Sequence, residues 1–578
     1  MASSAPHVPA HLRALVVEQA YEQYTSIDHA VWRFVLLQMR SRLAQTAHRA
    51  YRDGLDATGI SVDRIPSIAQ MNECLGRFGW AAVCVDGFIP PRAFQEFQAS
   101  AILPIAADIR TRDHLVYTPA PDIIHEAAGH APILPDPVFS AYLQRIGDLG
   151  RQAFTLPEEG AVFRAIHDLS EIKERPGASE DDVVRAEAAL AAAIAGATEA
   201  SEATRLSRLY WWTAEYGLVG RVDDYKIYGA GLLSSLGESE SCHDAAVEKI
   251  ALDERCMDVA YDITRPQPRL YVTPSFEVLH EVLDRAKRSL GVFLGGPAAV
   301  DRAIRSRETA SVRFSSGAWV MGVVAGAAPG PDCTWVDLTG RVGFAWDGPP
   351  LQGASPDVLS DLCVLCGPLE GGCELDRVTD GEIAHWADAG RTTHRVRFAS
   401  GATVEGRLAR VVRRTDGRVA YIDWDDARIA RPGCVPTALQ RYRMIAAGDL
   451  VTARAGAVDP GYHSETVYSA VRVPTALTAD PESARVLSLY ESAERAHRSG
   501  QATVAATFPL IHAALERDYP REWLLRWNLL ESLIKVGAAG ELADSLRAEL
   551  ERLEIIYDRR QPIASGLQYL ERIPRIAA

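Results

Sequence analysis

The residues of this sequence best able to do chemistry lie in the segment "PDIIHEAAGH", which contains His125, Glu126 and His130. The zinc hydrolase motif H-E-x-x-H places its second histidine four residues after the first, whereas here the spacing is five. Because each α-helical residue turns the chain by about 100°, two residues five apart end about 140° apart. Such a pair predicts a metal site only if the helix stops or unwinds between the two histidines.

Residues that end helices stand close to the second histidine. Gly129 directly precedes His130, and Pro132 follows two residues after it. We therefore expect His125 on the last full helical turn and His130 on the helix exit, turned back toward it. The alternative is two ordinary histidines, one of which caps a helix end.

A third ligand is offered by Glu215 in the aromatic segment "RLYWWTAEYGLVG". A buried glutamate is costly unless it is paired or bound to a metal, and pairing with an arginine is the alternative. Two histidines and one carboxylate form the facial triad of non-heme Fe(II) oxygenases, which leaves positions open for O2 and a cosubstrate. Glu158, Glu159 and Glu171 are formal competitors for the third ligand.

The elements that must position these residues belong to a mainly helical region over 1–290. One helix is expected over 26–55, beginning at a Ser-x-x-His start. Residues 157–205, rich in Ala, Glu and Arg, predict surface helices inserted into this region.

Two further regions follow. Residues 300–470 contain short alternating runs with glycine turns, which predict a β-rich module. The pattern V-R-F-x-S-G-x-x-V-x-G occurs there twice, at 312–322 and 396–406, so a duplicated β unit is an open possibility. Residues 475–578 predict a C-terminal module of amphipathic helical hairpins.

Composition limits the partners and the compartment. The net charge of −15 argues against a general nucleic-acid binder, which needs a surplus of Lys and Arg. The chain starts without the pattern of a signal peptide and contains no apolar run of the roughly 20 residues that a membrane helix needs. Nine cysteines in 578 residues are no disulfide framework. These features predict a reduced, cytoplasmic protein that binds neither nucleic acid nor membrane.

The sequence contains a second possible metal site, for which the support is weaker. Cys363, Cys366 and Cys373 lie together in "CVLCGPLEGGC", and His385 is the candidate for a fourth ligand. The spacing is not that of a standard zinc site, so ordinary thiols are the favoured interpretation.

Four ordered segments resemble signatures of the pterin-dependent aromatic amino acid hydroxylases: "YTPAPDIIHEAAGHAPILPDPVFSAYLQRIGDLG", "LYWWTAEYGLVG", "IYGAGLLSSLGE" and "YDITRPQPRLYVTPSFE". The resemblance runs from about residue 20 to 290, and within the family the chain is similar to the long bacterial branch. It implies a multidomain chain whose first 290 residues have the hydroxylase fold, while the two later modules have no implied role. It also implies a monooxygenase that uses Fe(II), O2 and tetrahydropterin to hydroxylate the ring of a free aromatic amino acid.

The resemblance assigns roles to single residues. His125, His130 and Glu215 would bind iron. Arg110 would bind the substrate carboxylate with a bidentate fork, and Arg112 is the nearby competitor for that role. The other implied residues are Asp122, bracing Arg110; Thr118, Pro121, Trp211, Tyr216, Gly231, Ser234 and Ile263 in the amino acid pocket; Ile89, Phe94 and Glu126 at the pterin; Tyr210 near iron and pterin; and Ser234 again, orienting an iron-binding histidine.

The implied substrate rests on two positions. Ile263 stands where tyrosine hydroxylases carry an aspartate, which argues against a phenol. Trp211 matches the phenylalanine enzymes, whereas Ile263 itself resembles the tryptophan enzymes. We expect conversion of phenylalanine to tyrosine, with tryptophan as the rival substrate. A non-catalytic amino acid sensor and a zinc hydrolase remain further alternatives, and association of copies through the C-terminal modules is left open.

Overall fold

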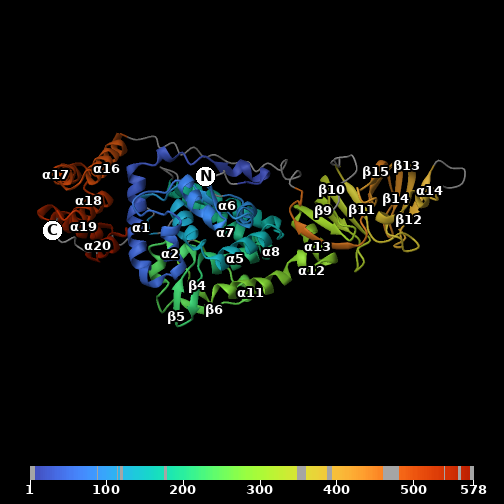
Figure 1. The fold of residues 1–578 in the computed structure, drawn as a ribbon, viewed down its shortest axis with the longest axis horizontal. Helices are drawn as coiled ribbons and strands as arrows, with labels where there is room; N and C mark the ends of the chain where they lie inside the picture. The colour runs from blue at the N-terminus through green and yellow to red at the C-terminus, as the bar shows by residue number, and fades with distance from the viewer. Residues whose placement is uncertain are drawn as a thin grey trace.

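The computed structural model describes residues 7–87, 89–112, 115–116, 122–174, 179–263, 265–347, 359–386, 393–459, 481–538, 540–557 and 561–572. A mainly helical region occupies the middle of an elongated molecule, with β-sheets at one end and the C-terminal helices at the other (Figure 1). In this described part, no helix is both long enough and apolar enough to cross a membrane.

The central region is built from helices and short helical turns, the latter labelled η. Its α-helices are α1 (Ser26–Thr46), α2 (Arg49–Ala57), α3 (Ile68–Leu75), α4 (Pro91–Ala99), α5 (Pro137–Gly150), α6 (Pro157–Glu174), α7 (Glu180–Gly196), α8 (Glu202–Tyr210), α9 (Ala230–Ser234), α10 (Glu238–Ser241) and α11 (Phe276–Ala286). Two π-helices, η5 (Ile124–His130) and η7 (Trp211–Glu215), lie among them. The 3-10 turns are η1 (Ala10–Leu15), η2 (Tyr21–Gln23), η3 (Gly76–Phe78), η6 (Ala131–Ile133), η8 (Glu254–Asp258) and η9 (Lys287–Ser289).

Helix α1 begins at a capping box. The Thr25 hydroxyl accepts a hydrogen bond from Asp28 N, and the Asp28 carboxylate accepts one from Thr25 N. The prediction of a single helix over 26–55 is wrong, because the chain leaves the helix at Ala47 and His48. There His48 N donates to Ile227 O at 2.8 Å, and the His48 ring caps α2.

Two small sheets complete the central region. In the first, β1 (Val16–Val17) pairs antiparallel with β2 (Ala81–Val85), which pairs parallel with β3 (Ile102–Ala106). The second has the order β5 (Asp224–Ile227), β4 (Leu218–Arg221), β7 (Arg269–Thr273) and β6 (Glu248–Ala251). The predicted insertion contains α6 and α7, which pack on each other through Leu169, Ala186 and Leu190.

Among its described residues, the β-rich region contains two antiparallel sheets. The order of the first is β11 (Leu362–Leu365), β10 (Trp335–Trp346), β9 (Ala318–Ala327), β8 (Thr309–Phe314) and β16 (Leu450–Ala455). The second contains β12 (His394–Arg397), β13 (Thr403–Arg413), β14 (Val419–Ala430) and β15 (Thr437–Ile445). Short helices accompany them: α12 (Gly291–Leu294), α13 (Gly296–Ser306), η10 (Leu375–Arg377) and α14 (Asp380–Ala384).

Both copies of the repeated pattern form the same hairpin. Gly317 joins β8 to β9 with φ +83°, and Gly401 joins β12 to β13 with φ +86°, a left-handed conformation that favours glycine. Each glycine N–H donates to the preceding phenylalanine carbonyl, Phe314 O at 3.0 Å and Phe398 O at 2.9 Å. The two hairpins thus share their turn as well as their sequence.

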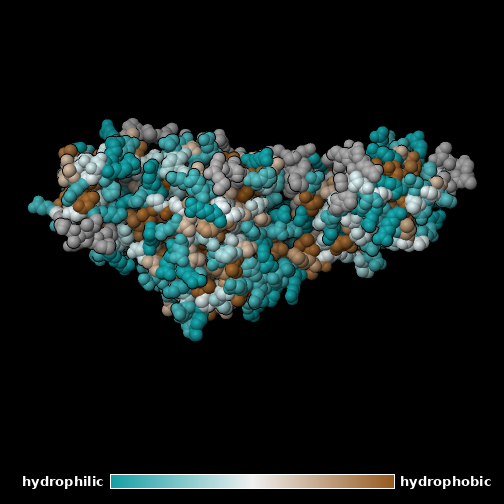
Figure 2. Space-filling view, in the orientation of Figure 1, coloured by the Kyte–Doolittle hydropathy of each residue, from teal (hydrophilic) through white to brown (hydrophobic). Residues whose placement is uncertain are grey.

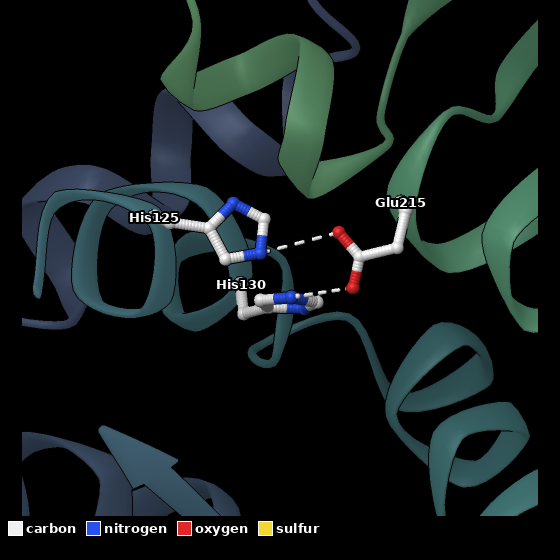
Figure 3. Close-up of side chains that lie close together, drawn as sticks. All are labelled: His125, His130 and Glu215. Atoms are coloured by element: carbon white, nitrogen blue, oxygen red, sulfur yellow. Dashed lines mark ion pairs between the residues drawn. The ribbon is translucent and has the colours of Figure 1, made fainter. Parts of the chain in front are cut away.

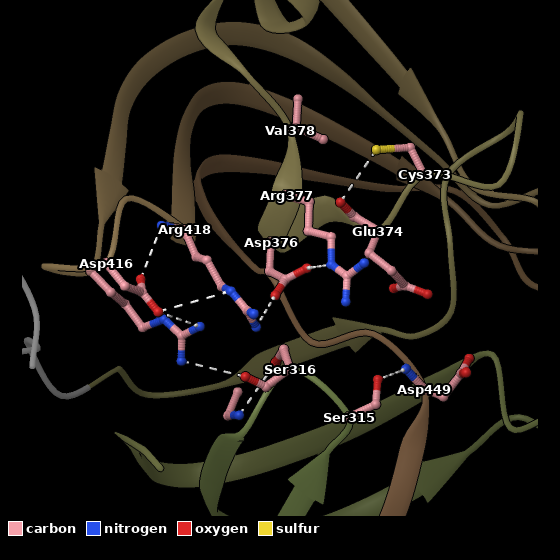
Figure 4. A network of polar contacts seen from close by, with 12 residues as sticks. Ser315, Ser316, Cys373, Glu374, Asp376, Arg377, Val378, Asp416, Arg418 and Asp449 are labelled. Atoms are coloured by element: carbon pink, nitrogen blue, oxygen red, sulfur yellow. Dashed lines mark hydrogen bonds and ion pairs between the residues drawn. The ribbon is translucent and has the colours of Figure 1, made fainter. Parts of the chain in front are cut away.

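A polar network lies between the two sheets (Figure 4), where Arg414, in the turn between β13 and β14, donates to Ser316 O at 3.4 Å in the turn between β8 and β9. Arg418, in the same turn, donates to Asp376 of η10 at 3.3 Å and lies 3.9 Å from Asp416. On the first sheet, the Ser315 hydroxyl accepts from Asp449 N at 2.8 Å. Both sheets share one hydrophobic core that contains one residue from the central region, Phe154.

The C-terminal helices are α16 (Pro481–Ser499), α17 (Gln501–Asp518), α18 (Trp523–Lys535), α19 (Glu541–Tyr557) and α20 (Ile563–Arg572). Helices α16, α18 and α20 pack against α1. Their apolar side chains belong to the same hydrophobic core as the central region. Phe34 of α1 lies edge-on to Trp523 and Trp527, with ring centroids 5.1 and 4.7 Å apart.

Hydrophobic residues gather at the surface where α12 and α13 meet the strands of the β-rich region (Figure 2), and Phe293 of α12 is 50% exposed.

Candidate active site

His125, Glu126 and His130 lie on the π-helix η5. The hydrogen bonds of a π-helix run from residue i to i+5, so residue i+5 lies above residue i. The two imidazoles consequently face the same side, with ring centroids 4.9 Å apart (Figure 3). The sequence predicts that the helix stops or unwinds between the two histidines, and the structure has a π-helix over both of them. His130 is the last residue of η5, and the backbone continues from it into the 3-10 turn η6.

Gly129 allows η5 to approach α9. A Cβ at this position would lie 2.7 Å from Ala230 O, closer than real Cβ contacts allow. The close approach brings Ser234 of α9 to His125, where Ser234 Oγ lies 3.0 Å from His125 Nδ1. Because the Ser234 hydroxyl donates its hydrogen to Ala230 O at 2.7 Å, we assign Nδ1–H of His125 as the donor to Oγ. That tautomer leaves a lone pair on His125 Nε2.

Glu215, the last residue of the π-helix η7, faces both histidines (Figure 3). Its Oε2 lies 3.2 Å from His125 Nε2, and its Oε1 lies 3.0 Å from His130 Nε2. Burial alone would raise the pKa of Glu215, but the two imidazoles hold that pKa well below its ordinary value. Burial opposes charge on His125, yet Glu215 raises the pKa of His125 to about 9. The cluster therefore favours positive charge between its three side chains.

These three residues fit a divalent metal ion. Their potential ligand atoms lie within 4.8 Å of one another. His130 Nε2 is buried and faces Glu215 Oε1 at 3.0 Å, so both atoms could bind one ion. Two imidazole nitrogens and one carboxylate suit Fe(II) with open positions.

The three glutamates named as competitors for the third metal ligand are Glu158, Glu159 and Glu171. Glu159 accepts the backbone N–H groups of Leu156 at 3.1 Å and Ser201 at 2.9 Å. Glu158 is exposed, and the side chain of Glu171 is outside the described set. Glu126 is buried beside the cluster, with Oε2 3.9 Å from His130 Nε2 and without a hydrogen bond. Burial raises the pKa of Glu126, although the neighbouring histidines oppose the rise.

Arg110 and Asp122 form a buried pair beside the histidines. Both residues are 3% exposed. Arg110 Nε and Nη2 donate to the two carboxylate oxygens of Asp122, each at 2.8 Å, and Arg110 Nη1 donates to Ser234 O at 3.2 Å. Asp122 also accepts His125 N at 3.0 Å, so one carboxylate orients both the arginine and the start of η5. Arg112, the competitor, pairs with Glu522 of the C-terminal helices.

Aromatic rings line the neighbouring space. Trp211 stacks on Tyr261, with ring centroids 4.1 Å apart at 6°, and on Tyr216 at 4.6 Å. Gly231 permits this packing, because a Cβ there would lie 2.9 Å from the Tyr216 ring. Ile263 is half-buried two residues after Tyr261, whereas Thr118 and Pro121 lie outside the described residues.

The residues implied at the pterin are only partly assembled. Phe94 lies edge-on to Tyr210 at 5.9 Å, and Tyr210 lies 6.4 Å from the His130 ring. Ile89 packs instead on a small separate cluster with Phe97. Burial raises the pKa of Tyr210 well above its ordinary value, so its hydroxyl keeps its proton.

Three residues near the site were missed from sequence. Gln98 donates to the Tyr210 hydroxyl at 2.7 Å, Glu238 accepts from the Tyr216 hydroxyl at 2.7 Å, and Tyr261 forms the stack on Trp211. Glu238 ends the segment "IYGAGLLSSLGE" and Tyr261 begins "YDITRPQPRLYVTPSFE", so both stood inside recognisable segments. Gln98 lies in α4 without such a signal.

The cysteine cluster does not assemble a metal site. In the described part of the chain, Cys363, Cys366, Cys373 and His385 form no group with metal-ligand geometry. His385 Nδ1 lies 2.6 Å from Gly381 O, and Cys363 Sγ accepts from Arg431 at 3.5 Å.

Comparison with known proteins identifies relatives of the central region. Residues 18–153 and 180–291 match the family model described as biopterin-dependent aromatic amino acid hydroxylase. A phenylalanine-4-hydroxylase of Caulobacter vibrioides is 31% identical over 269 residues, which are 46% of this chain and 76% of the relative. A phenylalanine-4-hydroxylase of Ralstonia nicotianae is 32% identical over 268 residues, covering 46% of this chain and 72% of the relative.

Two solved structures are also similar to part of this chain. Chromobacterium violaceum phenylalanine hydroxylase with bound Fe(III) is 28% identical, with a TM-score of 0.38 over 47% of this chain and 85% of that chain. The same enzyme with iron(III) and 7,8-dihydrobiopterin is 26% identical, with a TM-score of 0.38 over 49% and 92%. The β-rich region and the C-terminal helices lie beyond the residues that the family model matches.

Proposed function

This chain belongs to the biopterin-dependent aromatic amino acid hydroxylase family, and we propose that it hydroxylates phenylalanine to tyrosine with Fe(II), O2 and tetrahydropterin. The observation that carries the proposal is the cluster of His125, His130 and Glu215, in which two imidazole nitrogens face one buried carboxylate. The cluster lies inside the matched region, and relatives about 30% identical over most of their length are phenylalanine hydroxylases.

Iron would be held by His125, His130 and Glu215. Iron and tetrahydropterin, when bound, supply the activation of O2, which none of the side chains at the site can perform. Ser234 fixes the His125 tautomer that presents Nε2 to the metal. Glu126 and Phe94 are the proposed neighbours of the pterin, the first by hydrogen bonding from its buried carboxyl group and the second by ring stacking.

The substrate would be oriented by its carboxylate. Asp122 occupies Arg110 Nε and one hydrogen of Nη2, which leaves the outer N–H groups of the guanidinium for a second carboxylate. Because the same Asp122 accepts His125 N, the distance from the substrate carboxylate to the metal ligands is set by one rigid group. This arrangement suits a free amino acid, whose carboxylate is not part of a peptide bond.

The aromatic ring of the substrate would lie among Trp211, Tyr216 and Gly231. Stacked rings form an apolar wall that excludes water from the reacting centre. Ile263 extends this apolar character at the position that argues against a phenol substrate. These residues hold the ring and leave the chemistry to the metal and the pterin.

A competition assay tests the proposal. Fe(II)-loaded protein is given phenylalanine, tryptophan and tyrosine together with tetrahydropterin and O2, and the products are separated by chromatography. Tyrosine formed from isotopically labelled phenylalanine is the expected product. Hydroxylated tryptophan as the main product would reassign the substrate. Binding without any product, at full iron loading, would make the protein an amino acid sensor.

A further inference from the structure

Glu522 connects the C-terminal helices to the segment that carries Arg110. It is the N-cap of α18, where Oε1 accepts Leu525 N at 3.2 Å and the Tyr490 hydroxyl at 2.8 Å. Its other oxygen, Oε2, accepts from Arg112. The Glu522 side chain is 3% exposed, whereas that of Arg112 is 38% exposed. A nearly buried carboxylate on the C-terminal helices thus holds a half-exposed arginine of the central region.

The helices that carry Glu522 are themselves firmly held. Arg33 of α1 donates to both carboxylate oxygens of Glu531 at 2.9 and 2.8 Å, and Glu531 is completely buried. The Ser26 hydroxyl donates to Glu494 at 2.7 Å, at a second place on α1. Since these contacts are independent of Arg112, Glu522 is a fixed point relative to α1.

The segment around Arg110 is held on its inner side by the active site. Ile123 N donates to Asp108 O at 2.9 Å, and Arg110 N donates to Asp122 at 2.9 Å. The segment 108–112 is therefore bound to Asp122 from inside and to Glu522 from outside. With both ends held, the guanidinium of Arg110 has a defined position.

We propose that Glu522 is a positioning residue for amino acid binding, acting through Arg112 on the backbone from which Arg110 extends. This inference rests on the proposed function of Arg110 in binding the substrate carboxylate. A bidentate contact is sensitive to small displacements, because both hydrogen bonds must align at once. The C-terminal helices thereby become part of the substrate-binding apparatus without touching the substrate.

The variant Glu522→Gln tests the proposal, because glutamine retains the cap and the volume but loses the charge that holds Arg112. We expect the KM for phenylalanine to rise about 5- to 30-fold, with kcat changed less than about twofold. The matched control is Glu531→Gln, which removes an equally buried charge from α18 whose arginine lies on α1. The control should lower Tm and leave KM unchanged, because the Ser26–Glu494 hydrogen bond and the packing of Trp523 and Trp527 on Phe34 still hold the C-terminal helices against α1. Equal KM values for the two variants would show a merely structural role and overturn the proposal.

A second measurement does not depend on catalysis. Hydrogen exchange of peptides covering 103–112 should become faster in Glu522→Gln and in Arg112→Gln, but not in Glu531→Gln. The double variant Arg112→Gln/Glu522→Gln should exchange no faster than either single variant, because both remove the same contact. If Glu522→Gln fails to fold, Arg112→Gln on the half-exposed partner carries the test alone.

The two proposals fail in different ways. Unchanged exchange at 103–112 in Arg112→Gln would overturn the positioning role even if phenylalanine is hydroxylated. Faster exchange there, in a protein that binds no aromatic amino acid, would overturn the assigned role of Arg110 and with it the effect on substrate.

Discussion

Two clusters of histidine and carboxylate side chains occur in the described residues. One has two imidazoles and one carboxylate, and the other has one imidazole and two carboxylates. The first is His125, His130 and Glu215; the second is His512, Glu516 and Glu549, on the C-terminal helices. In each, the potential ligand atoms lie within 4.8 Å of one another. Distance alone therefore does not separate a metal centre from an ion-pair network.

The second cluster already contains its cation. Arg526 Nε donates to Glu549 Oε2 at 2.6 Å, while His512 Nε2 lies 2.6 Å from Glu549 Oε1. Glu516 is exposed and 3.9 Å from His512. In the described part of the chain, Glu215 pairs with no lysine or arginine, and two imidazoles share its carboxylate. A buried carboxylate that faces two imidazoles and neither lysine nor arginine therefore marks a place for a cation, whereas a carboxylate paired with arginine holds helices together.

The largest expected effect comes from Glu215→Gln. Losing this charge should remove iron and reduce tyrosine formation on the order of a thousandfold or more, because a bound metal is worth several kcal/mol in the transition state. Iron content by mass spectrometry and product by chromatography measure the two losses. Glu549→Gln is the control and should keep its iron. Full iron in Glu215→Gln would refute the assignment.

The same Glu549→Gln change should instead lower stability. Arg526 is 2% exposed and would be left buried without its counter-ion, which costs about 3–5 kcal/mol in free energy of unfolding. Urea titration of the iron-loaded protein measures the loss. A drop in iron content with unchanged stability would reverse the roles of the two clusters.

Glu238 is a buried carboxylate that, among the described residues, forms no ion pair with lysine or arginine and accepts hydrogen bonds from Tyr216 and Gln267 N. Burial raises its pKa from 4.5 to about 7, partly offset by the hydrogen bond from Tyr216. Between these pH values the folded state binds the proton more tightly than the unfolded state, so this group makes the protein less stable as pH rises from about 4.5 to about 7. The shift corresponds to roughly 3 kcal/mol. Glu238→Gln should abolish that part of the slope, as measured by denaturant titration at pH 5 and pH 8; identical slopes would contradict the assignment.

The smallest expected effect concerns the orientation of His125. Ser234→Ala removes the acceptor of His125 Nδ1–H and should weaken metal binding about 10- to 100-fold. Competition against a metal-binding dye measures the affinity without any turnover. Ser235→Ala is the neighbouring control, because the Ser235 hydroxyl accepts a hydrogen bond from Glu238 N at 3.2 Å, whereas the partner of His125 Nδ1 is Ser234. Equal affinities in both variants would remove Ser234 from the metal site.

Sequence predicted the residues of the candidate site better than the backbone that carries them. The spacing of His125 and His130 indicated that an α-helix could not serve, but a spacing rule cannot distinguish a helix that ends from one that widens. The π-helix η5 packs closely on α9 at Gly129, and this tertiary contact is not contained in a spacing rule. The pairing of Arg110 with Asp122 was accessible only because the resemblance named both.

The fold shows the same limit at larger scale. Periodicity predicted helices after residue 475 and strands between 300 and 470, and both kinds of element are present there. It did not predict the surface on which the C-terminal helices pack. An apolar face such as that of α18 requires a partner, but nothing in the pattern around Trp523 and Trp527 identifies Phe34 as that partner.

The packing of α1 on α18 has a consequence for biosynthesis. Arg33 and Glu531 are separated by 498 residues. At about 5–20 residues per second, a ribosome needs about 25–100 s to make the helix that covers α1 after α1 itself has been made. During that interval the face of α1 around Phe34 lacks its cover of Trp523 and Trp527. The waiting time makes this protein a candidate substrate for chaperones that act on nascent chains, and slowing translation should increase its aggregation.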